Sequence, residues 1–259
     1  MGILNITPNS FYDGGKYRTE AEILYQAEVM LDEGATFIDV GAYSSKPNAE
    51  FVSELEELER IVPVINLLLK QFPEAIVSID TFRSEVAKAA IENGAALIND
   101  ISAGNLDERM METIAHYKVP YVMMHMRGNP ETMQSLTHYN NIIKEMILYF
   151  SEKVAKARSL GINDLILDPG FGFAKTIEQN YEVLQKLELF QMLELPILAG
   201  VSRKSMIYKL LNINAQEALN GTIVLNTVAL TKGAAILRVH DVKEAMECVT
   251  LFNKIHLSK

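Results

Sequence analysis

The sequence has few of the residues that cross-link chains or build basic surfaces. It contains one cysteine, Cys248, so no disulfide can form within the chain and no cluster of cysteines can hold a metal. Lysine and arginine number 24 against 33 aspartates and glutamates, which gives a net charge of −9. A broad basic face is therefore not expected, and we predict no nucleic-acid partner and no membrane partner.

Long hydrophobic runs are also missing. No apolar stretch approaches the roughly 20 residues that a membrane-spanning helix needs. The segment 1–13 has neither the basic start nor the apolar centre of a secretory signal. Together with the single cysteine, these features predict a cytoplasmic protein.

Several motifs of common cofactor sites are absent. No GxGxxG follows the first apolar run, and the histidines occur in neither HxH nor HExxH. The glycine-rich segment 168–175 lacks the Gly-Lys-Ser/Thr end of a phosphate loop. These absences argue against a histidine-held zinc site and against a doubly wound open sheet, which is the rival architecture.

Short apolar segments alternate with amphipathic ones along the whole chain. Continuous Val/Ile/Leu runs are typical of strands buried on both faces, and apolar residues spaced by three and four predict helices between them. Eight such units, in a chain near the usual size of about 250 residues, predict an α/β fold: a single (β/α)8 TIM barrel forming one domain over 1–259. The predicted strands are 2–4, 37–40, 75–79, 96–98, 121–124, 165–167, 197–199 and 235–237, and the predicted helices are 20–33, 52–70, 84–93, 107–117, 140–160, 178–191, 204–211, 215–232 and 243–254.

Nearly every predicted strand ends in a hydrogen-bonding or charged residue. Catalytic groups of barrel enzymes lie at these ends. Helix capping explains any single one, but Asp80, Asn99 and Asp168 each follow directly on an apolar run, which favours a shared polar pocket. The strand-end residues are Asn5, Asp39, Asp80, Asn99, Asp100, His125, Asp168, Ser202, Arg203, Lys204, Arg238, His240 and Asp241.

Two carboxylates and an amide suit a ligand rich in N–H donors. A carboxylate accepts two hydrogen bonds side by side, which matches the amidine edge of a guanine-like or pterin ring. Arg238 and His240 after the last strand, with the turn 202–205 before a helix, indicate a phosphate site. For Arg203 an ion pair at the surface is an equally good explanation, and for His125 packing is favoured.

Two polar loops, 5–15 and 41–48, have the composition of segments that close over an anionic substrate. Asn5 offers a neutral oxygen. Because magnesium is usually held by few protein oxygens and by substrate phosphate, Asn5 predicts a Mg²⁺ of that kind.

The segments at these positions resemble the dihydropteroate synthases of bacterial folate synthesis. They span residues 2–244 in the family's order and together are highly specific. The resemblance implies that 6-hydroxymethyl-7,8-dihydropterin diphosphate is joined to p-aminobenzoate, with release of pyrophosphate. The matching segments are GILNITPNSFYDGG, DVGAYSSKPNAEFVSELEELERIVPVI, SIDT, ALINDIS, VMMHMRGNPETMQ, LDPGFGFAKT, GVSRKSMI and ILRVHDVKE.

The resemblance also implies a role for individual residues and a homodimer. Asp80, Asp168, Lys204 and Asp13 of the first loop would act in catalysis. The pterin would be held by Asp80, Asn99, Asp168 and Lys204, with Met124 in the pocket wall. The diphosphate would face Asn5, Arg238 and His240, with Mg²⁺ at Asn5. The p-aminobenzoate site, which sulfonamides also occupy, would be lined by Ser45, Lys46, Pro47, Phe173 and Ser202.

The sequence departs from the family pattern at three places. Residues 41–48 read Gly-Ala-Tyr-Ser-Ser-Lys-Pro-Asn, where the family usually has Gly-Gly-Glu-Ser-Thr-Arg-Pro-Gly. Lys46 keeps the charge of that arginine but not its planar fork. Asn9 stands where an aspartate is usual, and the segment that precedes the first strand in the family is absent from the sequence. We expect the first two to alter loop closure and sulfonamide affinity more than the reaction.

Two other functions remain as alternatives. The first is a methyltransferase that binds methyltetrahydrofolate on a related barrel and methylates a corrinoid protein. It would share the Asp/Asn pocket but would not need the cationic turn 202–205 or the Arg-Val-His segment 238–240, which suit a diphosphate. The second is a non-catalytic pterin-binding subunit, against which the intact Lys204, Arg238 and His240 argue.

Overall fold

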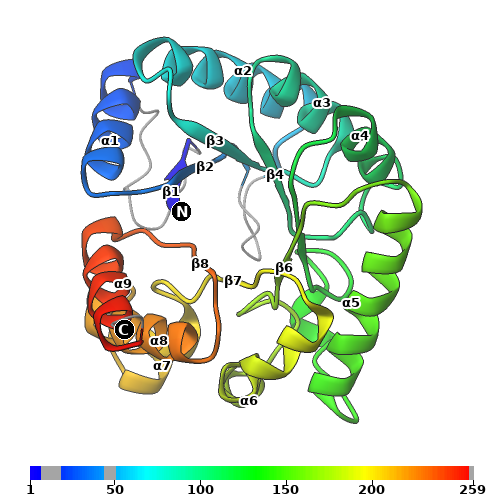
Figure 1. Ribbon diagram of the computed structural model, residues 1–259, viewed down its shortest axis with the longest axis vertical. Helices are drawn as coiled ribbons and strands as arrows, with labels where there is room; N and C mark the ends of the chain where they lie inside the picture. The colour runs from blue at the N-terminus through cyan, green and yellow to red at the C-terminus, as the bar shows by residue number, and fades with distance from the viewer. Residues whose placement is uncertain (7–18, 44–50, 257–259) are drawn as a thin grey trace.

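The computed structural model describes residues 1–6, 19–43 and 51–256 of the chain. Strands and helices alternate, and the helices surround the strands (Figure 1). The strands are β1 (Gly2–Asn5), β2 (Phe37–Gly41), β3 (Ile76–Asp80), β4 (Leu97–Asp100), β5 (Tyr121–Met124), β6 (Leu165–Asp168), β7 (Leu198–Ala199) and β8 (Ile236–Leu237). The helices are α1 (Glu20–Asp32), α2 (Glu54–Gln71), α3 (Ser84–Glu92), α4 (Met110–Tyr117), α5 (Ile142–Ser159), α6 (Ile177–Gln185), α7 (Ser205–Leu211), α8 (Leu219–Thr231) and α9 (Val242–His256), with 3-10 turns η1 (Met133–Ser135) and η2 (Leu187–Leu193).

The strands close into a barrel. β1 to β6 form one parallel sheet in chain order, and β7 pairs with β8. Single parallel bridges join Leu167 to Ile197 and Gly2 to Val239. Across the second bridge the backbone amide of Ile3 donates to the carbonyl of Val239 at 2.9 Å. The predicted (β/α)8 TIM barrel is therefore confirmed, with its seventh and eighth strands short.

One predicted helix is divided in the structure. The segment 178–191 was expected to be a single helix, but α6 ends at Gln185 and the tighter turn η2 follows. η2 keeps Leu187 and Phe190 buried in the core, and the left-handed Glu194 (φ 53°) ends it. The apolar spacing correctly predicted which residues are buried. It did not indicate that the α-helix changes to a 3-10 turn after Gln185.

The barrel interior has an apolar layer near the start of the strands. Successive side chains of a strand point to opposite faces, so one set fills the barrel and the other packs against the helices. The inner cluster contains Leu97, Val122, Ile166 and Leu198, from four neighbouring strands. This layer closes the lower end of the barrel.

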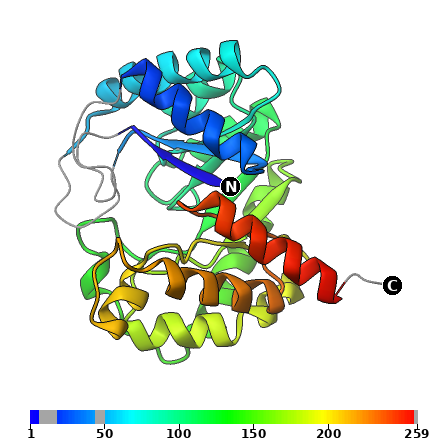
Figure 2. The ribbon, with the colours of Figure 1, turned by 90° about the vertical axis from the view of Figure 1, so that its left-hand side faces the viewer.

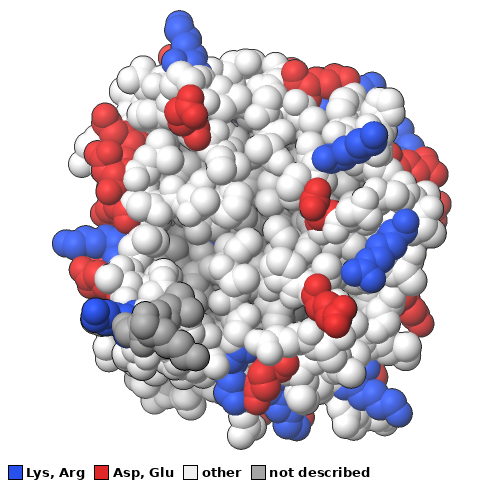
Figure 3. Space-filling model, viewed as in Figure 1, with Lys and Arg blue, Asp and Glu red and all other residues white. Residues whose placement is uncertain are grey.

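The two ends of the barrel differ in their charged groups. Figure 2 shows the N-terminus and the end of α9 on the same side of the molecule, with β1 running away from them. The face seen in Figure 3 is this lower end, and its centre is uncharged, with acidic and basic side chains interspersed around it. Among the residues that the structure describes, no helix is both long and apolar enough to cross a membrane.

Candidate functional site

Strand alternation decides which strand-end residues share the barrel interior. Register pairs Asp39 with Ser78 and Asp80 with Asn99, and it pairs Met124 with Asp168. These residues lie an even number of positions after the apolar inner layer, so they point into the barrel as well. Apart from Met124, these inward positions at the upper end are polar, where those of the lower layer are apolar.

Arg238, at the end of β8, joins two carboxylates across the barrel mouth. Its Nε donates to Asp39 Oδ2 at 2.6 Å and one terminal nitrogen donates to Asp80 Oδ2 at 2.7 Å. Burial alone would lower the pKa of Arg238, but the two carboxylates outweigh it and raise the pKa above its ordinary value. Arg238 therefore remains a cation, and it neutralises part of a buried acidic pair.

Asp39 is a site residue that was predicted only as a strand end, with no role assigned to it. It is fully buried, accepts from Ser78 Oγ at 2.5 Å and from Asn99 Nδ2 at 3.0 Å, and also bonds Arg238. The sequence did contain one indication of this role: alternation along the strand places Asp39, like Asp80, on the inner face of the barrel. Asn99 therefore uses its amide nitrogen on Asp39, which leaves its amide oxygen as the atom that can face a ligand donor.

Asp80 is a buried carboxyl group of the barrel mouth whose pKa is strongly raised. Burial raises its pKa to about 7, the charge of Arg238 opposes the shift, and the charge of Asp39 adds to it. Tyr43 Oη donates to Asp80 Oδ1 at 3.1 Å. Burial and the charge of Asp80 raise the pKa of Tyr43 well above its ordinary value, so the hydroxyl keeps the proton that it donates.

Tyr43 is the second residue that the sequence did not assign, although its position was recognised as a departure from the family. Its ring lies edge-on to Phe82, with the centroids 5.1 Å apart. Both rings border an apolar cluster beside Asp80, which suits one face of a flat heterocycle. The cluster consists of Ile101, Met124, Met126, Met133 and Ala174, with Tyr43, Phe82, Leu106 and Phe173 packed against it.

Asp168 lies on the far side of the same opening. Its Oδ1 accepts from the amide of Gly170 at 2.7 Å, and burial raises its pKa. Lys204 donates to the carbonyl of Phe171 at 2.7 Å, and its ammonium lies 4.5 Å from the ring centroid of Phe173. The predicted residues Asp168, Phe173 and Lys204 are thus brought together around the loop that follows β6.

The loops after β7 and β8 are tied to each other. Ser202 Oγ lies 3.0 Å from His240 Nδ1, so residues predicted for two neighbouring subsites are in contact. Arg203 makes a bidentate pair with Asp241, at 2.8 and 2.7 Å, and both side chains are largely buried. This geometry favours the ion-pair explanation for Arg203, although the pair is internal rather than at the surface.

Asn5 lies at the end of β1, beside Asp80. A Cβ at the neighbouring Gly41 would lie 3.6 Å from Asn5 Oδ1 and 3.8 Å from Asp80 Oδ2, so the glycine leaves room between two oxygens. Within the described ranges, no three His, Cys, Asp or Glu side chains form a metal cage. Asn5 Oδ1 is a neutral oxygen that fits a magnesium ion held chiefly by a phosphate group.

The remaining candidates divide into buried structural residues and residues that cannot be placed. Asp100 points outward and accepts from Tyr121 Oη at 2.6 Å and from Ser102. His125 is packed against Tyr149, as expected, and its Nδ1 lies 3.1 Å from Lys175 Nζ. Four predicted residues and one departure lie outside the described residues: Asp13, Ser45, Lys46, Pro47 and Asn9.

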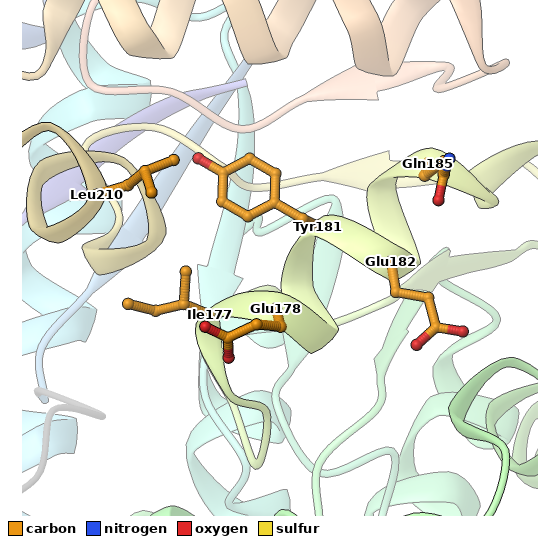
Figure 4. Close-up of a pocket in the computed structure, with 6 residues that line it drawn as sticks. All are labelled: Ile177, Glu178, Tyr181, Glu182, Gln185 and Leu210. Atoms are coloured by element: carbon orange, nitrogen blue, oxygen red, sulfur yellow. The ribbon is translucent and has the colours of Figure 1, made fainter.

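A pocket in the outer helical layer lies apart from these residues. Figure 4 shows it between α6 and α7, with the ring of Tyr181 directed toward Leu210. Tyr181 Oη donates to the carbonyl of Met206 at 3.0 Å, which joins the two helices. Its lining contains none of the predicted site residues, so the barrel mouth remains the candidate active site.

The chain is similar to known proteins over nearly its whole length. Residues 1–240 match the family described as pterin binding enzyme. The chain is 43% identical over 251 residues to dihydropteroate synthase of Escherichia coli (strain K12), covering 96% of this chain and 88% of that protein. The Yersinia pestis dihydropteroate synthase in a sulfonamide drug complex superposes with a TM-score of 0.95, at 39% identity and covering 99% and 94% of the two chains. The Xanthomonas albilineans dihydropteroate synthase with 4-aminobenzoic acid gives 0.91, at 34% identity and 100% and 93% coverage.

Proposed function

Because this chain belongs to the pterin-binding enzyme family and to the dihydropteroate synthases within it, we propose that it forms 7,8-dihydropteroate from 6-hydroxymethyl-7,8-dihydropterin diphosphate and p-aminobenzoate. Dihydropteroate synthases are transferases, and the products here are dihydropteroate and pyrophosphate. The observation that carries the proposal is the inward polar layer of Asp39, Asp80 and Asn99, joined by Arg238 beside an apolar wall.

The pterin ring binds between the polar layer and the apolar wall. Its N–H groups donate to the carboxylates of Asp80 and Asp168, and Asn99 offers its amide oxygen. Met124 belongs to the apolar cluster that forms the wall of the pocket, and the Lys204 ammonium donates to the ring carbonyl. Both carboxyl groups have raised pKa values because they are buried, and binding N–H donors favours their ionised forms.

The diphosphate lies toward Arg238, His240 and Asn5. Arg238 already touches Asp80, so its cation adjoins the pterin site and offsets the charge of the departing group. Mg²⁺ bound at Asn5 and the phosphate oxygens would further neutralise that charge. His240 is oriented by Ser202, which fixes the ring at the edge of the site.

The reaction needs no protein nucleophile. The bond from the pterin CH₂ to the diphosphate oxygen breaks, and its electron pair leaves with pyrophosphate. Positive charge on the CH₂ spreads into the ring near the carboxylates of Asp80 and Asp168. The arylamine nitrogen then bonds to this carbon and loses a proton. Positioning and electrostatic stabilisation supply the rate enhancement. Asp13 of the first loop is included among the catalytic residues in this proposal.

The p-aminobenzoate site lies near Phe173 and Ser202 and is completed by Ser45, Lys46 and Pro47. The related structures bind a sulfonamide drug and 4-aminobenzoic acid, which share the arylamine ring. The ring of Phe173, beside the Lys204 ammonium, offers a face for such an aromatic group. Sulfonamides are therefore competitive inhibitors of this chain in our proposal.

The protein acts in the cytoplasm as a homodimer. α8 contains no charged residue yet exposes Val224, and the adjoining α7 exposes Leu210 and Leu211. Figure 1 shows α7, α8 and α9 side by side on one flank, and exposed apolar side chains on neighbouring helices are typical of an interface with a second copy. Val224→Asp should give a monomer in sedimentation velocity. Leu148→Asp, at an equally exposed leucine on α5, is the control and should remain dimeric.

Pyrophosphate release tests the proposed reaction directly. Purified protein with Mg²⁺ and both substrates should release one pyrophosphate for each dihydropteroate. Omission of p-aminobenzoate, and addition of a sulfonamide, should each reduce the release. Methyl transfer from methyltetrahydrofolate without pyrophosphate would overturn the assignment, and inactivity with both substrate sets would favour a binding protein.

A further inference from the structure

The loop between β6 and α6, residues 169–175, has an unusual backbone. Gly170 and Gly172 have positive φ angles of 67° and 83°, and Ala174 also has a positive φ of 49°. An alanine is strained in this region, and the conformation persists only where neighbouring contacts hold the chain. The loop follows Asp168 and carries Phe173, so its conformation determines where two predicted substrate contacts lie.

Lys175 makes the contacts that hold this loop in place, and it makes them from the interior of the protein. Its side chain is buried, with 6% of the residue exposed, and its ammonium lies 3.0 Å from the carbonyl oxygens of Gly170 and Phe173. The third neighbour is Nδ1 of His125, at 3.1 Å. An ammonium has three N–H groups, and here they meet three neutral acceptors. The described contacts include no carboxylate.

The group can hold the loop in either protonation state. Burial lowers the pKa of Lys175 to about 7, with Asp168 opposing the shift and Lys204 and Arg127 adding to it. Burial also lowers the pKa of His125 well below its ordinary value, so the imidazole is neutral. A neutral amine still donates to two carbonyls, and its lone pair accepts from His125 when the ring proton is on Nδ1. All the hydrogen bonds are therefore preserved when the lysine loses a proton.

Other contacts fix the loop from the opposite side. Lys204 donates to the carbonyl of Phe171, and Asn180 accepts from the amide of Gly172 at 2.7 Å. The amide of Gly170 donates to Asp168 Oδ1, so a shift of Gly170 would turn the Asp168 carboxylate. Lys175 also donates to the carbonyl of Gly170. Gly170 therefore connects the buried lysine to the Asp168 carboxylate of the site.

We infer that Lys175, together with His125, is a positioning residue that fixes the loop 169–175 and thereby the Phe173 ring and the Asp168 carboxylate, without touching substrate itself. The kinetic part of this inference rests on the proposed function, whereas its structural part does not. Because Phe173 is held directly and Asp168 is also fixed by the backbone of β6, the larger effect falls on p-aminobenzoate.

Lys175→Met tests the inference, because it keeps most of the unbranched apolar part of the side chain and removes its donors. Amide hydrogen exchange should rise by about tenfold or more at residues 170–174, while the β-strand amides keep their protection. The KM for p-aminobenzoate should rise by about tenfold and kcat should fall by less than about threefold. Lys232→Met, which removes a surface pair with Glu188, is the matched control and should change neither.

Two results would overturn the inference: unchanged exchange in the loop, or exchange raised equally in all strands with an unaltered KM, which indicates a purely structural role. If Lys175→Met does not fold, His125→Leu removes one of the three contacts and should raise loop exchange by about threefold. The same exchange in His125→Leu and the native protein would contradict the proposed pair. Exchange needs no turnover, so a failure of pyrophosphate release in the native protein would be distinguished from a failure of the positioning role.

Discussion

The barrel interior contains two layers that belong to the same strands and have opposite character. The lower layer is built from Leu97, Val122 and Ile166. Two residues further along the same strands stand Asn99, Met124 and Asp168, and β2 and β3 add further carboxylates to this upper layer. One strand thus contributes to packing and, one inward position later, to binding. The upper layer has less apolar packing than the lower one, so its stability depends more on its internal ion pairs.

Arg238→Met should have the largest effect, because it leaves the buried carboxylates of Asp39 and Asp80 without their cation. We expect a loss of about 3–5 kcal/mol in the free energy of unfolding, measured in urea, together with loss of activity. The double variant Arg238→Met/Asp39→Asn should recover part of the stability. A loss below about 1 kcal/mol would show that the upper layer does not depend on this pair.

Asp80→Ala should reduce kcat/KM for the pterin diphosphate by about 100-fold or more, since the carboxylate is the proposed acceptor of ring N–H groups. Binding of 6-hydroxymethylpterin, followed by calorimetry without p-aminobenzoate, should weaken in parallel. Asp164→Ala removes an exposed carboxylate just before β6, at the other end of the barrel, and should leave both unchanged. Equal pterin affinity in Asp80→Ala and the native protein would refute the proposed pocket.

The acidity of Asp80 gives the upper layer a pH dependence that the lower layer cannot have. With a pKa near 7 in the folded protein, the carboxylate is ionised above that pH. Pterin affinity should be constant above about pH 7 and fall by about tenfold for each unit below it. Because this folded-state pKa is raised from 3.8, the same group should lower stability as pH rises from 3.8 to about 7. A flat affinity profile between pH 5 and 8 would contradict the assignment.

Ile166→Val should have the smallest effect and the opposite profile. It removes one methylene from the lower layer, so we expect a loss of about 0.5–1.5 kcal/mol in stability. The KM values for both substrates should stay the same, because the residue lies below the polar layer. Thermal unfolding and steady-state kinetics on one preparation would check both statements. A change in KM without a change in stability would refute the claim that the lower layer serves packing and the upper layer serves binding.

The sequence predicted the barrel and much of its polar layer for a physical reason. Apolar runs and alternation are local properties, so Asp80, Asn99 and Asp168 could be placed at strand ends without a structure. The partners of Arg238 could not be predicted, because Asp39 lies 199 residues away and meets it only when the barrel closes. Lys175 is equally obscure in the sequence, where it follows a glycine-rich segment and resembles a surface residue.

Tyr43 gives the barrel mouth a feature that can be used in inhibitor chemistry. Its hydroxyl occupies one oxygen of Asp80, at a position where the family usually has glutamate. The phenol is neutral where a glutamate would be charged, so an apolar group of an inhibitor that packs against the Tyr43 ring would be accepted here and disfavoured beside a carboxylate. Selectivity between this enzyme and those of its relatives can therefore be sought at the pterin edge, away from the arylamine end where sulfonamides bind.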